Sequence, residues 1–217
     1  MNKKNTLPKR ILVTAGPTVE PLDPVRFISN YSTGTMGYEI AREAARKGHD
    51  TCLVTGPVQL PPPAGAEVVR VQTALEMRDK VVERVENYDC VIMAAAVCDF
   101  RPGERKKDKI KKQEKMTLEL VKNPDILAEV GKKEGLVKVG FALETGEGWL
   151  ENAKEKLQTK NLDLIVTNVK EGARDPFGPG DKDFTIIDRA GNTKELKGAS
   201  KEQCAEIILS EVERLLG

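Results

Sequence analysis

Residues 10–16 of this chain read RILVTAG, a short run rich in aliphatic residues that ends in glycine. This length and composition predict a buried parallel strand. A polar stretch follows as far as residue 35. Apolar side chains then recur at helical spacing over residues 36–47, and Gly48 is a natural C-terminal stop. The chain therefore opens with a strand, a long connection and a helix.

Outward from this unit, predicted strands and helices continue to alternate. The first half adds strands at 50–56, 68–71 and 90–97, a proline-rich loop at 57–65 and a helix at 74–88. The second half adds strands at 116–121, 137–143 and 162–167, helices at 123–133 and 149–159, a hairpin of 184–188 with 193–196, and a helix from Ser200 to Leu216. This order predicts an α/β fold with a Rossmann-like, doubly wound, mainly parallel sheet. We expect one domain over residues 1–217, with a flexible basic loop at about 100–115.

Composition excludes several classes of protein. The chain has 217 residues, is 39% hydrophobic and has a net charge of +1, so no global charge favours nucleic acid or membrane. The longest apolar run, Val91–Val97, is far shorter than the about 20 residues of a spanning helix. The polar N-terminus has no apolar core of a secretory signal. We expect a cytoplasmic protein that binds neither nucleic acid nor membrane.

The numbers and spacing of cysteine and histidine limit the kinds of metal site and catalytic mechanism that this chain can have. The four cysteines show no CxxC spacing and are expected to be reduced core thiols. The single histidine, His49, excludes a histidine metal cluster and leaves only one residue for any histidine-based catalysis.

The connection after the first strand contains a candidate anion site. Gly34 and Gly37 at the predicted helix start would let backbone N–H groups approach an anion closely. The long insertion before them is expected to place Arg26, Asn30 and Ser32 over that site. An ordinary loop with glycine turns would leave the same pattern.

Residues 94–100, at the end of the predicted strand 90–97, point to the same edge of the sheet. Small residues there permit close approach of a ligand, and Asp99 lies where ligand contacts are expected in doubly wound folds. Residues 101–115 then hold eight basic residues against three acidic ones, which suits a polyphosphate but also suits a solvated surface. Further on, Asn123 is expected to cap a helix whose first turn contains Pro124 and Asp125. Spacing alone supports a polyanion-binding α/β enzyme.

Taken together, these stretches resemble the phosphopantothenate–cysteine ligase family of coenzyme A biosynthesis. The matching stretches are ILVTAGPT, EPLDPVRFISNYSTGTMG, LVTGPV, AAAVCDF, KIKK at 109–112, LVKNPDI, VGFALET and KNLDLIVTN, in the family's order from Ile11 to about Asn168. In many bacteria this ligase is the C-terminal half of a bifunctional protein with a flavin-dependent decarboxylase. The resemblance covers the ligase half, and implies a fused or separate decarboxylase as partner.

The resemblance implies a two-step ligation that uses CTP and Mg²⁺ in a homodimer. The carboxylate of 4′-phosphopantothenate attacks the α-phosphate of CTP, which releases pyrophosphate and forms an acyl-cytidylate. The amine of L-cysteine then displaces CMP. Such chemistry needs positioning and charge neutralisation more than a protein base, which suits a chain with one histidine.

The resemblance also implies roles for individual residues. Asn30 is expected to hold the acyl-nucleotide intermediate, and Lys109 to act catalytically from a strap that closes over the site. The expected nucleotide contacts are Gly16, Ser32, Gly34, Met36, Gly37, Ala95, Ala96, Asp99, Lys109, Asn123, Pro124, Asp125, Ile126, Phe141, Lys156 and Lys160. No protein ligand for Mg²⁺ is identified, and the ion is expected to be carried mainly by the triphosphate.

Two other functions compete with the ligase. One is a nicotinamide- or flavin-dependent oxidoreductase on a Rossmann-like sheet, against which the absence of a tight GxGxxG turn counts. The other is an RNA-binding module that uses the basic loop. The net charge of +1 and the lack of aromatic residues between Arg101 and Lys115 count against it.

Overall fold

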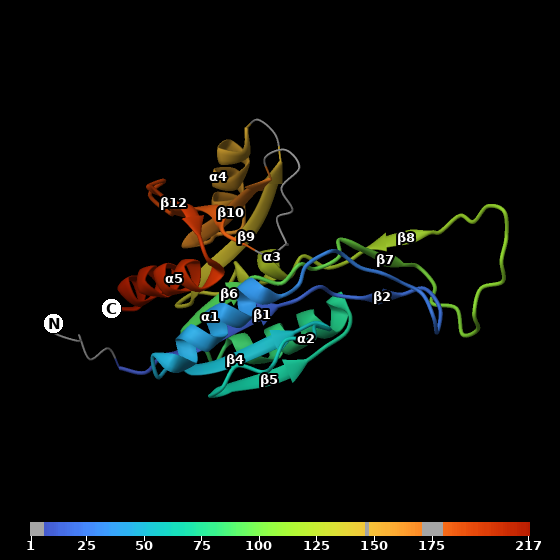
Figure 1. Cartoon of the computed structure of the whole chain (residues 1–217), viewed down its shortest axis with the longest axis horizontal. Coiled ribbons are helices and arrows are strands. Elements are labelled where there is room, and N and C mark those ends of the chain that lie inside the picture. The colour runs from blue at the N-terminus through green and yellow to red at the C-terminus, as the bar shows by residue number, and fades with distance from the viewer. Residues whose placement is uncertain (1–6, 146–147, 171–179) are drawn as a thin grey trace.

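An eight-stranded sheet forms the centre of the molecule in the computed structural model, which describes residues 7–145, 148–170 and 180–217 (Figure 1). Across the sheet the order is β12-β11-β10-β9-β6-β1-β4-β5. The bounds are β1 Arg10–Ala15, β4 Asp50–Thr55, β5 Ala66–Arg70, β6 Cys90–Met93, β9 Val137–Thr145, β10 Leu164–Lys170, β11 Lys182–Asp188 and β12 Thr193–Ala199.

The strand order contains one reversal of direction. From β1 the chain adds β4 and β5 on one side, then returns to place β6, β9 and β10 on the other side, all in parallel. The switch point therefore lies between β1 and β6. Strands β11 and β12 close one edge as an antiparallel hairpin. The expected doubly wound, mainly parallel sheet and the closing hairpin are both confirmed.

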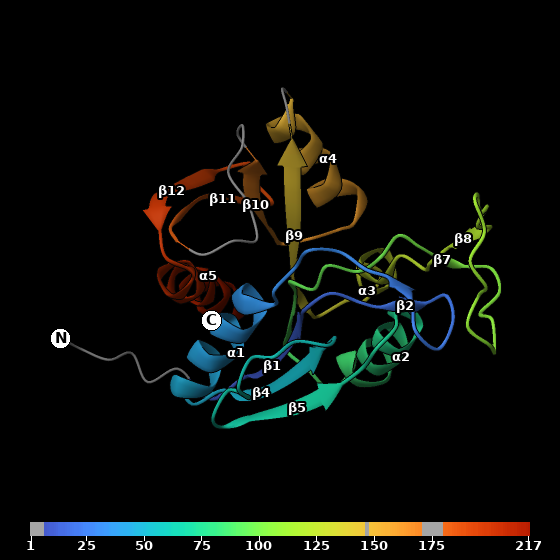
Figure 2. The same ribbon diagram turned by 45° about the vertical axis from the view of Figure 1, so that its right-hand side comes forward.

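Helices cover both faces of the sheet (Figure 2). Helices α1 (Thr35–Arg46) and α5 (Lys201–Leu216) pack on one face, where Ile11 and Val13 of β1 point. Helices α2 (Ala74–Val85), α3 (Ile126–Val130) and α4 (Trp149–Thr159) lie on the other face, and Leu12 packs with the residues of α2. Because side chains alternate along a strand, a run that is apolar at every position is buried on both faces.

An arm of two short ribbons extends from the sheet (Figure 1). One ribbon pairs β2 (Glu20–Pro21) with β3 (Phe27–Ile28), and the other pairs β7 (Phe100–Pro102) with β8 (Leu120–Lys122). Residues 103–119, here called the strap, join β7 to β8. The prediction of a loop at about 100–115 was wrong at its start, because Phe100–Pro102 forms strand β7 and pairs with β8. The expected strand at 116–121 was also wrong: residues 116–119 are exposed, and pairing begins only at Leu120.

Two other predicted elements are only about half as long as expected. The strand at 90–97 ends at Met93, because its pairing with β9 ends at Met93 opposite Gly140. The helix at 123–133 covers only Ile126–Val130. Its expected cap was wrong as well: Asp125, not Asn123, accepts the Ala128 amide at 2.9 Å, so Pro124 precedes the cap. The side chain of Asn123 is buried and donates to the carbonyl of Cys98 instead.

The cysteines and the histidine are structural. All four cysteines are buried free thiols, as expected. His49 is also buried, at the amino end of β4, where its ring accepts the Lys9 amide and contacts Glu213 at 3.1 Å. Among the described residues, no group of three or more His, Cys, Asp or Glu side chains is placed to hold a metal ion. None of the described helices is long and apolar enough to cross a bilayer.

Candidate active site

A cavity of about 510 Å³ lies at the carboxyl ends of the parallel strands, beside the switch point. This volume falls within the roughly 300–1,000 Å³ of small-molecule sites. Nine of the expected site residues line it: Asn30, Ser32, Gly34, Met36, Ala95, Ala96, Asp99, Phe141 and Lys156. Segments that follow β1 and β6 thus meet at one edge of the sheet, as the strand order requires.

The start of α1 forms one wall of this cavity. Gly34 is the N-cap in a left-handed conformation, with φ of 76°, and Thr35 and Met36 follow it along the cavity. No side chain caps α1, and its first turn contains no acidic residue. The first N–H groups of the helix and its positive dipole end are therefore available to an anion at this wall.

Glycines 16 and 37 act in packing and do not line the cavity. A Cβ on Gly37 would lie 2.6 Å from the Cβ of Ala15, so only glycine lets α1 lie directly on β1. Gly16 has φ of 77°, and its Cα would be 3.1 Å from a Cβ on Gly34. Both glycines therefore bring the helix start close to the end of β1.

The wall opposite α1 is the segment that follows β6. The Ala95 amide donates to Thr14 Oγ1 at 3.1 Å, and the Ala96 amide donates to the carbonyl of Gly16 at 2.9 Å. These bonds attach the segment to the end of β1 and leave its small side chains along the cavity.

Asn30 joins the two walls. Its Nδ2 donates to the carbonyl of Ala96 at 2.6 Å, and its Oδ1 accepts the Ser32 amide at 3.0 Å. Both ends of the amide are held, so the side chain has one orientation where it lines the cavity. The nearby Cys98 thiol is buried, which raises its pKa and keeps it protonated.

The expected contacts at 123–126 and Lys160 lie beside the cavity and do not line it. The Asn123 amide donates to the carbonyl of Asp99 at 2.7 Å, which links this segment to a residue that lines the cavity. Lys160, at the end of α4, pairs with Asp125 at the start of α3. Burial alone would raise the pKa of Asp125, but the Lys160 hydrogen bond and the Ala128 amide lower it. That carboxylate is therefore ionised at neutral pH.

Lys109 and Arg26 lie away from the cavity. Lys109 is exposed on the strap. Arg26 was expected over the site, but its guanidinium pairs with Asp23 at 3.0 Å and donates to the carbonyl of Ile110. Both residues belong to the arm.

Several cavity residues were missed by the sequence analysis. Asn168, Phe184 and Lys201 come from β10, β11 and the first position of α5. The cavity is also lined by Thr33, Thr35, Ala94, Val97, Ala142 and Leu143, which lie within or beside the candidate segments of the sequence. The charged side chains among the described lining residues are two lysines, Lys156 and Lys201, and one carboxylate, Asp99, so the net charge of the lining is positive.

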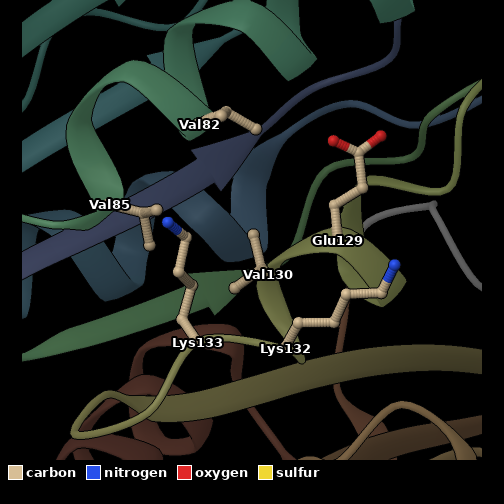
Figure 3. Close-up of a pocket in the computed structure, with 6 residues that line it drawn as sticks. All are labelled: Val82, Val85, Glu129, Val130, Lys132 and Lys133. Atoms are coloured by element: carbon tan, nitrogen blue, oxygen red, sulfur yellow. The ribbon is translucent and has the colours of Figure 1, made fainter.

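A second cavity, of about 470 Å³, lies between α2 and α3 (Figure 3). Val82 and Val85 on α2 face Val130 on α3, and charged side chains come from α3 and the residues just after it. Two of these are already paired, Glu129 with Arg78 and Lys133 with Glu86. No expected site residue lines this cavity, so we take the first cavity as the candidate active site.

The strand order and the first cavity define a doubly wound α/β fold with a cavity at its switch point. The chain belongs to the family described as the DNA/pantothenate metabolism flavoprotein C-terminal domain, whose model matches residues 7–216.

Known relatives agree with this membership. The coenzyme A biosynthesis bifunctional protein CoaBC of Bacillus subtilis is 44% identical over 211 residues, which cover 95% of this chain and 52% of that protein. A crystal structure of the C-terminal domain of CoaBC is 37% identical, with a TM-score of 0.84 and 98% of both chains covered. These relatives confirm the resemblance seen in the motifs. The chain spans about half the length of the curated relatives it matches.

A more distant structure shares the fold. It is a Cab2 mutant, H337A, in complex with phosphopantothenate-cysteine, 19% identical with a TM-score of 0.77, covering 96% of this chain and 86% of that one.

Proposed function

We propose that this chain ligates 4′-phosphopantothenate and L-cysteine with CTP, through an acyl-cytidylate, and releases pyrophosphate and CMP. The observation that carries this proposal is the cavity at the switch point, bounded by Asn30, the start of α1 and Lys156. Family membership and the ligand named for the Cab2 structure support the choice of substrates.

In the first step, a carboxylate oxygen of phosphopantothenate attacks the α-phosphorus, and the bond to the β-phosphate oxygen breaks. The negative charge of the triphosphate must be neutralised throughout. The N–H groups at the start of α1 and the two lysines that line the cavity would supply this stabilisation.

In the second step, the amine of cysteine attacks the acyl carbon and CMP leaves. We propose that Asn30 holds the intermediate, because its amide lines the cavity in a fixed orientation. Phe141 is a half-buried ring on the cavity wall and is our candidate for contact with the base. The choice of CTP over ATP comes from the family resemblance.

The residues of the cavity suit a metal that enters with the nucleotide. Asp99 is the single carboxylate among the described residues that line the cavity, and Mg²⁺ commonly binds through one or two carboxylates plus phosphate oxygens and water. When bound, Mg²⁺ would supply charge neutralisation at the phosphates.

We also propose a homodimer formed through the arm. Exposed apolar side chains gather there: Val25, Phe27, Phe100, Met116, Leu118 and Leu120. A second copy packed on the arm would cover them. It would also explain why Lys109, an expected catalytic residue, does not line the cavity of its own chain.

Two further proposals concern cellular context. A decarboxylase, fused or separate, is the proposed partner, because the CoaBC relatives are bifunctional proteins about twice as long as the matched region. A reducing cytoplasm suits the four free thiols. We propose no nucleic-acid or membrane partner.

The test of the ligase is pyrophosphate release with Mg²⁺ and 4′-phosphopantothenate, comparing CTP with ATP, with and without L-cysteine. We expect sustained release only with CTP and cysteine, and a single-turnover burst without cysteine. Lys132→Ala, at the second cavity, is the control variant and should behave as wild type. Release with ATP alone would overturn the choice of nucleotide, and no release with either nucleotide would overturn the ligase.

A further inference from the structure

Asp23 is a buried carboxylate at which two distant segments meet. Its side chain is fully buried in the arm. Oδ1 accepts the Val25 and Arg26 amides, each at 2.8 Å. Oδ2 accepts the Ile110 amide at 3.0 Å and pairs with the Arg26 guanidinium at 3.0 Å. Every acceptor position of the carboxylate is thus directed at a donor.

These bonds fix the strap to the turn between β2 and β3. Ile110 is held from both sides, since its amide donates to Asp23 and its carbonyl accepts from Arg26. A second attachment lies four residues earlier, where the Lys106 amide donates to the carbonyl of Leu22 at 2.9 Å. Lys109 stands between the two attachments, directly before the held amide, while its own side chain is exposed.

The chemistry of this contact requires a carboxylate. Burial alone would raise the pKa of Asp23, but the amides of Ile110, Val25 and Arg26, with the Arg26 charge, lower it to about 2. An asparagine could keep only one oxygen, and its NH₂ group would oppose either the Ile110 amide or the two turn amides. The contact is therefore specific to aspartate.

We propose that Asp23 is a positioning residue for Lys109: its contact with Ile110 sets the point from which the lysine reaches the ligand. This inference rests on the proposed function, in which Lys109 is catalytic. It gives a physical role to the DPVR motif, which supplies the carboxylate, the turn and the guanidinium. Lys109 would then act from an anchored backbone, and less chain entropy would be lost when it meets the triphosphate.

The contact can be broken from either side. Asp23→Asn replaces one of the two acceptor oxygens with an NH₂ group and removes the charge that pairs with Arg26, and Ile110→Pro removes the amide proton without changing any charge. Asp108→Asn is the matched control, because it removes an exposed carboxylate next to Lys109. Lys109→Ala and the double variant Asp23→Asn/Lys109→Ala complete the set. Circular dichroism melts identify any variant that fails to fold.

Two readouts separate positioning from a merely structural role. The first is trypsin cleavage after Lys111, because Ile110, the residue directly before it, must leave Asp23 before this stretch of chain can enter the protease. We expect cleavage to become about tenfold faster in Asp23→Asn and Ile110→Pro, as for the loss of a contact of about 1.4 kcal/mol, and to stay unchanged in Asp108→Asn.

The second readout is steady-state ligation. In the same two contact variants we expect kcat to fall roughly 10- to 100-fold, as for a misplaced reactive group. The double variant should be no worse than Lys109→Ala.

The outcomes distinguish this inference from the proposed function. Unchanged cleavage in both contact variants would overturn the inference, as would normal kcat in both while Lys109→Ala is inactive. Additive losses in the double variant would also overturn it, because Asp23 would then act independently of Lys109. If wild type shows no ligation, the proposed function fails, and cleavage alone decides whether Asp23 holds the strap.

Discussion

At the scale of single residues, Asn30 connects the two walls of the cavity. Its amide binds the carbonyl of Ala96 and the amide of Ser32, so the side chain that is proposed to hold the intermediate also aligns the loop around it. Preorganised donors of this kind stabilise charge that develops during a reaction.

We expect Asn30→Ala to retain CTP binding but fail to complete ligation. The rate of ligation should fall about 10²- to 10³-fold, as for the loss of a preorganised donor. The Kd for CTP should change by less than about tenfold, or about 1.4 kcal/mol. Single-turnover assays that compare pyrophosphate release with product formation measure both steps. Asn87→Ala, an exposed amide at the end of α2, is the control. Normal turnover in Asn30→Ala would contradict the assigned role.

Asp23 gives a pH dependence whose sign follows from its pKa. The folded pKa, about 2, is below the ordinary 3.8, so the ionised carboxylate stabilises the folded state above about pH 4. That contribution is lost as the pH falls from about 4 to about 2. The difference in free energy of unfolding between wild type and Asp23→Asn should therefore be constant from pH 5 to 8 and shrink below pH 4. Urea titrations across this range measure it, and a difference that grows on acidification would contradict the assignment.

At the scale of elements, the close packing of α1 on β1 requires a residue without a side chain, and this residue is Gly37. Gly37 lies where a Cβ would be 2.7 Å from the carbonyl oxygen of Thr14. The backbone at the start of α1 therefore packs directly on the strand, and this contact fixes the position of the helix start that lines the cavity.

We expect Gly37→Ala to destabilise the fold by about 1–3 kcal/mol, the usual range for overpacking. The clash should outweigh the gain in helix propensity of about 1 kcal/mol. Urea unfolding at neutral pH measures the change. Gly103→Ala is the matched control, because a Cβ there would meet its nearest neighbour at 3.5 Å and its φ is not positive. Equal stability of the two variants would show that α1 does not need the close approach.

Elements with strong local signals were predicted well. Helix α5 begins where it was predicted, because Ser200 caps it and forms a capping box with Gln203. Elements that depend on distant partners were predicted poorly. Asn123 has the composition of a helix cap, but the buried carbonyl of Cys98 takes its amide, and Asp125 becomes the cap. Helix α3 ends at Gly131, where a Cβ would lie 2.1 Å from the carbonyl oxygen of Lys160.

At the scale of the whole molecule, the arm exposes several apolar side chains to solvent when the chain is a single copy. Phe27 is 59% exposed and Leu120 is 44% exposed, on neighbouring ribbons. The single-domain organisation of the chain and the proposed dimer both stay predictions.

We expect wild type to have twice the mass of the 23.9 kDa chain in solution. Phe27→Asp combined with Leu120→Asp should yield a monomer, because two charges would be buried without partners at the interface. Sedimentation velocity or light scattering measures the mass. Leu215→Asp, which replaces an exposed leucine near the end of α5, should leave the dimer intact. A monomeric wild type, or a double variant that remains dimeric, would contradict this interface.

The sequence by itself determined the class of fold, the family and half of the residues that line the cavity. Strand and helix periodicities are local, and the rule that carboxyl ends of parallel strands meet at one edge was enough to bring Asn30 and Ser32 together with Ala95 and Asp99. Only the tertiary structure decided that Phe184 and Lys201 join them, that Gly37 serves packing, and that Asp23 holds the strap. Each of these depends on a contact between segments far apart in the chain, and no local pattern of residues encodes such a contact.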